Sequence, residues 1–174
     1  MDFQLTEEQR MLQDLVTRFV DDELMPLERA VMARETSGEP GGLIAEELKP
    51  LHARCKELGL WGLDVPEEIG GADLDSVTLV AVNEALGKTC VPFTFPPDSP
   101  NLHMLLKTAN DEQRAKYLDP YARGETVSAI AISEPGAGGD PSGMLTRAVQ
   151  DGDDWVINGR KIWVSRIKNA DFSI

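Results

Sequence analysis

Two short segments of the sequence carry the residue types with the clearest chemical use. The first runs from Ser133 to Asp140 and reads Ser-Glu-Pro-Gly-Ala-Gly-Gly-Asp. Its glycines permit unusual φ values and close backbone approach, so successive N–H groups can converge on an anion such as a pyrophosphate. The second runs from Asn158 to Ser165 and reads Asn-Gly-Arg-Lys-Ile-Trp-Val-Ser. It adds a flat indole ring and a hydroxyl group.

Each segment taken alone has a plainer interpretation. Glycine clusters are common in loops, and the spacing in the first segment matches neither the Rossmann nor the Walker pattern. The segment also follows a predicted strand but precedes no evident helix, which counts against a doubly wound nucleotide fold. Trp163 on an alternating strand would normally belong to a core, and Ser165 would be a solvent-facing strand end.

The elements before these segments are predicted to be helical. Thr6 and Gln9 form a capping box, and apolar residues at helical spacing follow to about Leu24. Pro26 predicts a kink or restart, and the range 36–42 predicts a loop. Further helix boundaries are marked by Gly59 as a C-terminal stop, Asp75 or Ser76 as a cap before Leu86, a Pro- and Phe-rich loop over 91–100, a restart near Leu102, and a capping box at Asn110.

After Gly124 the pattern changes to short strands. They are predicted at 127–133, 145–150, 155–157 and 161–164, and Asn158-Gly159 predicts a type I′ hairpin between the last two. We therefore expect an all-α domain over 1–126 and the start of a β domain over 127–174. Because such a sheet is unfinished, we expect either a longer protein or a chain that needs a partner.

Composition excludes several classes of protein. A net charge of −13 and a pI near 4.5 argue against nucleic acid as a partner. No apolar run approaches the length of a membrane span. Cys55 and Cys90 lack metal-ligand spacing, so neither a metal site nor a disulfide is expected. The start at Met1 has no signal core or transit pattern, which predicts a cytoplasmic protein; the alternative is a mitochondrial matrix protein numbered from its mature start.

The order of the motifs resembles the acyl-CoA dehydrogenase family. In that family a helical domain precedes a β domain that opens with Ser/Thr-Glu-Pro-x-Ala-Gly-Ser/Thr-Asp and continues with Asn-Gly-x-Lys-x-Trp-Ile-Thr/Ser. The resemblance covers essentially all 174 residues. Other segments that sit as they do in the family are Leu5 to Gln9, Glu57 to Leu60, Val65 to Glu67 with Gly70-Gly71, and Glu84 to Gly87.

The resemblance implies the fold, a cofactor and a set of site residues. The fold would be a mainly α N-terminal domain of five or six helices followed by the first strands of a β-barrel domain. The cofactor would be FAD. Its pyrimidine edge would meet Ile132 and Ser133, its pyrophosphate Gly138 and Gly139, its ring face Trp163, and its N5 region Ser165; Phe95 and Ser99 would help shape the acyl pocket.

The resemblance also implies a reaction and partners. The family's oxidoreductases desaturate an acyl-CoA to a trans-2-enoyl-CoA in fatty acid and lipid metabolism and pass electrons to an electron-transfer flavoprotein. They act as homodimers or homotetramers. Their base is a glutamate in a C-terminal helical domain, so no catalytic residue is expected in this chain, and the chain alone is expected to be inactive. Alternatives are a flavin oxidase or monooxygenase of the same fold, and a non-catalytic helical interaction module.

Two departures from the family pattern qualify this implication. Gly139 replaces the family's Ser or Thr, which removes a side-chain hydrogen bond. Arg166 follows Ser165 where the family often has a small residue, so the acyl-CoA entrance is expected to be unusual. Glu134 is expected to brace the glycine turn rather than to act as a base. His52 and His103 stand singly and are expected in packing or at the surface.

Overall fold

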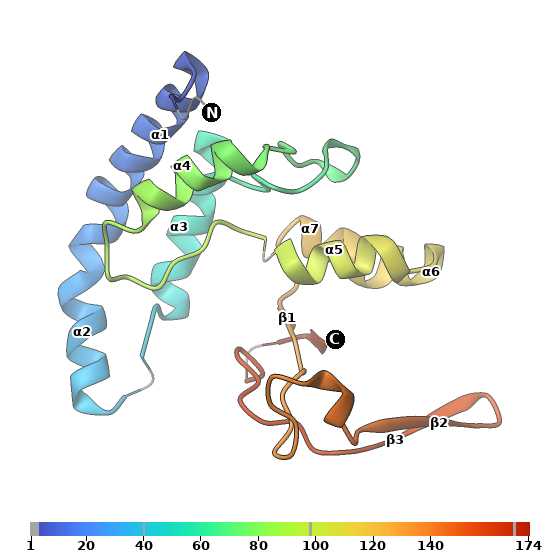
Figure 1. Cartoon of the computed structure of the whole chain (residues 1–174). Helices are drawn as coiled ribbons and strands as arrows, with labels where there is room; N and C mark the ends of the chain where they lie inside the picture. Colours follow the sequence, from blue (N-terminus) through green and yellow to red (C-terminus); the bar gives the residue numbers. More distant parts are fainter. Residues whose placement is uncertain (1–3, 40, 98, 169) are drawn as a thin grey trace. The chain divides into compact units, whose positions relative to one another are not determined.

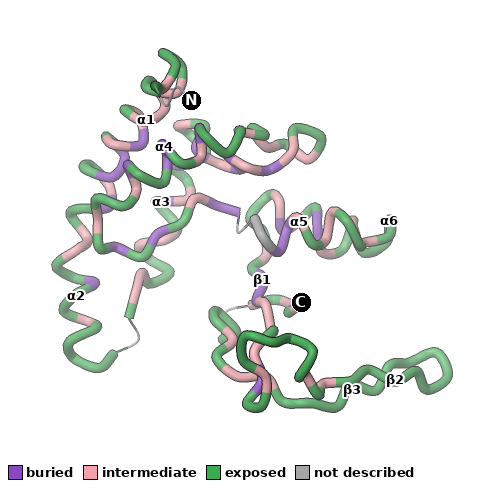
Figure 2. The backbone as a smooth tube through the Cα atoms, viewed as in Figure 1, coloured by how far each residue is buried: buried purple, intermediate pink, exposed green. Residues whose placement is uncertain are grey.

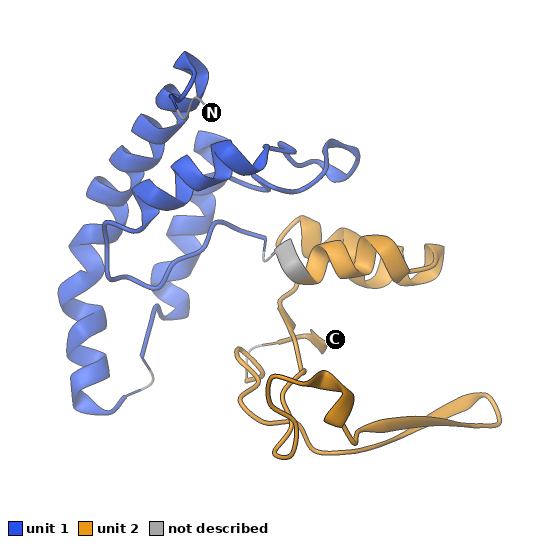
Figure 3. Ribbon diagram, in the orientation of Figure 1, with its two compact units in different colours: residues 1–99 blue, residues 100–174 orange. Residues whose placement is uncertain are grey.

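The computed structural model describes residues 4–39, 41–97, 99–168 and 170–174 (Figure 1). The residues before Gln4, on which the prediction of a cytoplasmic protein partly rests, lie outside this part. The chain divides into two compact units, Met1–Ser99 and Pro100–Ile174 (Figure 3). The predicted change from an α to a β domain at residue 126 remains a prediction, and helix gives way to strand between Ala122 and Ser128.

The first unit opens with a helix whose cap the sequence predicted. Helix α1 spans Glu7–Phe19, and its capping box is closed by hydrogen bonds between Thr6 and Gln9 of 3.2 and 2.9 Å. A π-helical turn (Val20–Leu24), a 3₁₀ turn (Met25–Leu27) and helix α2 (Glu28–Ser37) follow. The backbone stays helical past Pro26, and what changes there is the helix type, from a π turn through a 3₁₀ turn to α2.

Two more helices complete this unit. Helix α3 spans Ala45–Leu58 and ends at Gly59, which adopts φ +71°. Helix α4 spans Ser76–Leu86, and the carboxylate of its cap residue Asp75 accepts hydrogen bonds from the N–H groups of Val77 and Thr78. Both boundaries agree with the sequence prediction, because a left-handed glycine and a short acceptor side chain each satisfy backbone groups that the helix end leaves free.

The core of this unit lies where the helices face one another, shown in purple in Figure 2. Phe19 of α1 is 2% exposed, and its ring lies 5.6 Å from those of Phe93 and Phe95. The Pro- and Phe-rich loop therefore packs its aromatic side chains into the helical core. Other buried members of the core are Val16, Val20, Leu24, Val31, Leu51, Cys55, Leu60, Leu63, Val82, Ala85 and Val91.

A compact loop between α3 and α4 folds back on itself. The N–H groups of Ala72 and Asp73 donate to the carbonyls of Gly62 and Val65, at 2.8 and 2.9 Å. This return path brings Gly71 against Val65 so closely that a Cβ on Gly71 would overlap the Val65 carbonyl group. Glycine is required at this position because another backbone passes beside it.

The second unit begins with helices. Helix α5 spans Ser99–Thr108, and α6 (Asp111–Gln113) continues through a π-helical turn (Arg114–Leu118) into α7 (Asp119–Ala122). The capping box at Asn110 forms as predicted, with hydrogen bonds of 3.0 and 2.9 Å to Gln113. None of the helices in the described residues has the length and apolarity needed to span a bilayer.

The strands of this unit correct part of the prediction. Strand β1 (Ser128–Ala129) pairs in parallel with β4 (Phe172–Ser173), and β2 (Arg147–Asp151) pairs antiparallel with β3 (Asp154–Asn158). The segment 161–164, predicted as a strand, is irregular. The strand predicted over 127–133 is regular only at Ser128 and Ala129.

The hairpin turn lies at Gly152-Asp153, not at Asn158-Gly159 as predicted. Gly152 has φ +64° at the first central position, the pattern of a type II′ turn. Asn158 instead ends β3 opposite Arg147. Gly159 follows there because its backbone passes next to Thr146, whose side chain a Cβ would overlap. The glycine thus serves close approach and not a positive φ.

Candidate functional site

The two chemically distinctive segments lie side by side in the second unit. The N–H of Ile162 donates to the carbonyl of Ser133 at 2.9 Å. The ammonium of Lys161 donates to the carbonyl of Ile132 at 3.0 Å. The structure therefore brings the start of the glycine loop to the Trp163 segment, although the two are well separated in the sequence.

Glu134 is the centre of this arrangement. Its carboxylate accepts hydrogen bonds from the N–H groups of Leu145 and Thr146, at 2.7 and 3.1 Å, and from the ammonium of Lys161 at 2.8 Å. The side chain is only 5% exposed. The hydrogen bond from Lys161, together with those from Thr146 and Leu145, lowers the pKa of Glu134 from 4.5 to about 2. The prediction that Glu134 braces the turn is confirmed, because its carboxylate joins the start of the glycine loop to the backbone of Leu145 and Thr146 and to Lys161.

Acid is expected to release this brace only at very low pH. A carboxyl whose pKa is lower in the folded than in the unfolded protein contributes its full stabilisation above the unfolded value. For Glu134 this contribution is complete above about pH 4.5, declines below it, and is lost as the pH falls through about 2. The ¹³C shift of the Glu134 carboxyl in an NMR titration is expected to have its midpoint near pH 2. A midpoint at or above 4.5 would contradict the brace.

The glycine loop leaves open space at its glycines. The N–H of Ala137 donates to the Glu134 carbonyl at 3.3 Å, and the Asp140 carboxylate accepts from the N–H of Ser142 at 2.9 Å. A Cβ at Gly136, Gly138 or Gly139 would meet no atom within 4 Å, and none of the three has a positive φ. The chain's own packing therefore does not require these glycines, whereas a group approaching the backbone from outside would.

Trp163 is not a core residue in this structure. The residue is 87% exposed, and its backbone has φ +55°, which is unusual for a bulky residue. Ser165 is exposed as well, and Ile132 is 53% exposed. An exposed indole beside exposed apolar surface is typical of a place where a ligand or another protein segment binds.

The residues predicted to shape an acyl pocket belong to the first unit. Phe95 packs against Phe19 and Phe93, so its ring contributes to the core described above. Ser99 begins α5, and its side chain lies outside the described part of the structure. A substrate contact by either residue remains a prediction.

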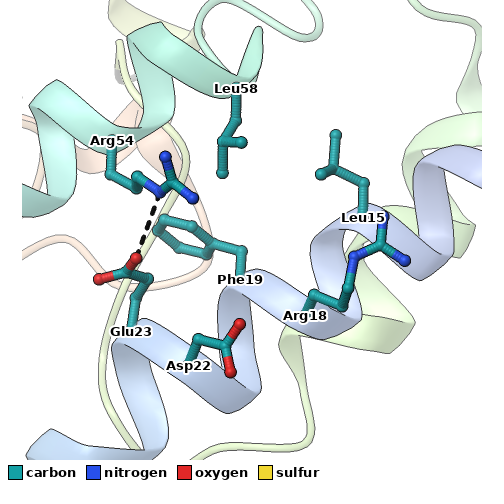
Figure 4. A pocket seen from close by; sticks show the side chains of 7 residues that line it. All are labelled: Leu15, Arg18, Phe19, Asp22, Glu23, Arg54 and Leu58. Carbon is teal, nitrogen blue, oxygen red and sulfur yellow. Dashed lines mark ion pairs between the residues drawn. The ribbon is translucent and has the colours of Figure 1, made fainter.

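A cavity of about 250 Å³ opens on the first unit between α1 and α3 (Figure 4). Two arginines and two acidic residues surround its apolar floor, and Arg54 forms an ion pair with Glu23 at 3.3 Å. Its lining contains none of the predicted site residues: Leu15, Arg18, Phe19, Asp22, Glu23, Arg54 and Leu58. In the described residues, no cluster of three His, Cys, Asp or Glu side chains is arranged to hold a metal ion.

One residue of the site was missed by the sequence analysis. Lys161 belongs to the Trp163 segment, has a side chain only 24% exposed, and contacts the start of the glycine loop through Ile132 and Glu134. The only signal in the sequence was an acid, Glu134, in one segment and a lysine, Lys161, in the other. That signal is weak, because residues this far apart in the sequence have no fixed spacing that predicts a contact.

The donor set suits a flat, anionic cofactor such as FAD. Open backbone at Gly138 and Gly139 can approach a pyrophosphate, and the exposed indole of Trp163 offers an apolar face to a ring system. Short polar groups are present at Ser133 and Ser165. The residues present therefore fit this cofactor.

Two family models match the chain. The model of the N-terminal domain of acyl-CoA dehydrogenases matches residues 6–125, and the model of their middle domain matches residues 129–174. These matches confirm the predicted fold class, a helical N-terminal domain followed by the start of the middle domain.

Individual relatives match over nearly the whole chain. (R)-Benzylsuccinyl-CoA dehydrogenase of Thauera aromatica is 42% identical over 95% of this chain and 43% of its own length. A glutaryl-CoA dehydrogenase structure from Mycobacterium smegmatis, in complex with FADH2, is 25% identical, with a TM-score of 0.73, over 97% of this chain and 42% of that one.

A third match comes from a structure that concerns the electron transferring flavoprotein of Acidaminococcus fermentans and flavin-based electron bifurcation. It is 31% identical, with a TM-score of 0.70, over 99% of this chain and 44% of that one. The chain thus spans less than half the length of the relatives it matches.

Proposed function

The chain belongs to the acyl-CoA dehydrogenase family, and on that premise we propose that it forms part of the FAD and substrate site of an enzyme that desaturates acyl-CoA thioesters to trans-2-enoyl-CoA. The observation that carries the proposal is the pairing of the glycine loop with the Trp163 segment through Glu134. This pairing leaves the loop glycines and the indole accessible on one unit.

In this proposal each site residue holds a defined part of FAD. The backbone of Ile132 and Ser133 and the hydroxyl of Ser133 bind the pyrimidine edge. The backbone of Gly138 and Gly139 binds the pyrophosphate. Trp163 covers the ring face, and Ser165 donates near N5. When bound, FAD supplies the acceptor for the β-hydride of the substrate. Donors aimed at the cofactor stabilise the negative charge that the reaction places there.

Glu134 does not serve as the base that removes the substrate's α-proton. A carboxylate with a pKa of about 2 is a poor proton acceptor at neutral pH, and its oxygens already accept from three donors. We assign the base to a glutamate outside this chain. Further parts of the proposal are an electron-transfer flavoprotein as acceptor, a homodimeric or homotetrameric enzyme, and residence in the cytoplasm or mitochondrial matrix.

Replacing Trp163 by Ala tests the cofactor assignment. The variant loses the apolar ring that covers the flavin, so FAD retained after gel filtration is expected to fall severalfold, by analogy with aromatic stacking worth about 1–3 kcal/mol per ring. The measurement is flavin absorbance per protein, made on the protein expressed from its complete gene.

Trp155→Ala is the matched control, since Trp155 is 62% exposed on β3 outside the proposed site. Equal flavin content in both variants would contradict the role of Trp163. Substrate assays should start with benzylsuccinyl-CoA, the acyl-CoA named for the relative of 42% identity. A protein that binds FAD but oxidises no acyl-CoA would contradict the desaturation and leave the cofactor assignment intact.

A further inference from the structure

Lys161 of the Trp163 segment contacts the start of the glycine loop. Its ammonium has three N–H groups. Three acceptors lie close to it: the Ile132 carbonyl at 3.0 Å, the Glu134 carboxylate at 2.8 Å and the Met144 sulfur at 3.9 Å. Two of these contacts are close hydrogen bonds to chain atoms, so we expect Lys161 to act through the groups it holds.

The group that matters is the peptide between Ile132 and Ser133. In a planar trans peptide the C=O and N–H bonds point in opposite directions. Because the Ile132 carbonyl points to Lys161, the N–H of Ser133 is directed away from Lys161. In the described residues no hydrogen bond joins the Ser133 N–H or hydroxyl to another group. The loop therefore presents the Ser133 N–H on that side and keeps the Ile132 carbonyl turned away.

Glu134 fixes the position from which Lys161 acts. The carboxylate is itself held by two backbone N–H groups, and its side chain is 5% exposed against 24% for Lys161. A shielded, hydrogen-bonded ion pair of this kind confines a long side chain that would otherwise sample many rotamers. Exposed lysines of the same unit, such as Lys168, have no such anchor in the described residues.

We propose that Lys161 is a positioning residue that sets the orientation of the 132–133 peptide, so that the flavin site meets the N–H of this peptide and not its carbonyl. The inference rests on the proposed function. Without Lys161 the peptide is free to rotate and turn its carbonyl oxygen toward the cofactor. A carbonyl dipole there opposes the electron-rich reduced flavin, whereas donors stabilise it.

The test compares Lys161→Gln, Lys161→Arg and the control Lys168→Gln in the protein expressed from its complete gene. FAD affinity is measured by flavin fluorescence on adding FAD to deflavinated protein, the reduction potential by dye equilibration, and folding by thermal melting. Lys161→Gln is expected to bind FAD about tenfold more weakly, the loss of about one hydrogen bond to a charged group, and to shift the potential to more negative values. Lys161→Arg restores part of both, and Lys168→Gln matches the wild type.

The outcomes separate this inference from the proposed function. A wild-type protein that binds no FAD overturns both. A folded Lys161→Gln protein with wild-type affinity and potential overturns the inference alone. So does a variant that melts at lower temperature while its flavin potential is unchanged, because Lys161 would then only brace the fold. If Lys161→Gln does not fold, an unchanged potential in Lys161→Arg overturns the inference, and a negative shift supports it.

Discussion

Gly71→Ala is expected to unfold the helical unit at temperatures where the wild type is intact. The new Cβ overlaps the carbonyl group and Cβ of Val65. The backbone cannot yield without breaking the hydrogen bonds of Val65 with Gly62 and Asp73, at 3.2 and 2.9 Å. Overpacking that moves backbone atoms costs about 3 kcal/mol or more, a large fraction of a domain's stability. Thermal unfolding followed by circular dichroism at 222 nm measures the loss.

Gly70→Ala is the matched control for this prediction. Gly70 has φ +88°, so alanine there is strained, but its Cβ would meet nothing within 4 Å. Strain alone costs about 1–2 kcal/mol. Gly71 has no positive φ, so its penalty comes only from the contact with Val65. A melting temperature for Gly71→Ala equal to or above that of Gly70→Ala would contradict the close approach of Gly71 to the Val65 backbone.

Glu134→Gln is expected to abolish retention of FAD by the complete protein while leaving the helical unit folded. Glu134 receives hydrogen bonds from the N–H groups of Leu145 and Thr146 and from the ammonium of Lys161. A carboxylate only accepts, whereas the glutamine amide must present one NH₂ group to these donors. The buried ion pair is also lost, and breaking such a pair by removing one partner is strongly destabilising. Flavin absorbance after gel filtration and circular dichroism are the measurements.

Glu125→Gln provides the comparison. Glu125 pairs with Arg123 at 2.7 Å, but both side chains are more than half exposed. Exposed ion pairs contribute about 0–1 kcal/mol, so this variant is expected to keep its flavin. If Glu134→Gln kept as much FAD as Glu125→Gln, the brace would not be needed for the cofactor site.

The sequence predicts the helical part well because the relevant signals are local. Thr6, Asp75 and Asn110 mark helix starts by satisfying N–H groups within three residues, and Gly59 marks an end by its left-handed conformation. The two site segments are recognised by their resemblance to the family's motifs, which are likewise short runs of residues. These are properties that a few neighbouring residues determine.

The β part was predicted less well because the hairpin turn forms at a different glycine from the one predicted. Asn158-Gly159 has the stronger hairpin pattern, yet the turn forms at Gly152 and Gly159 instead accommodates Thr146. The register in which β2 pairs with β3 decides which glycine lies in the hairpin turn, and this register is a non-local property. The Lys161 contact with Ile132 and Glu134 was missed for the same reason.

The parallel pairing of β1 with β4 joins the two ends of the chain segment that holds the proposed site. Val127 and Asp171, which are 44 positions apart, are joined by a hydrogen bond of 2.8 Å, and the whole region 133–165 lies inside that closure. Ribosomal synthesis delivers residues 1–99 first, so the helical unit has all its residues before β4 exists. Contacts within residues 133–165 can form as these residues emerge, whereas the β1–β4 pair needs Phe172 and Ser173. The closure around the proposed cofactor site can therefore form only after every residue of the helical unit has been synthesised.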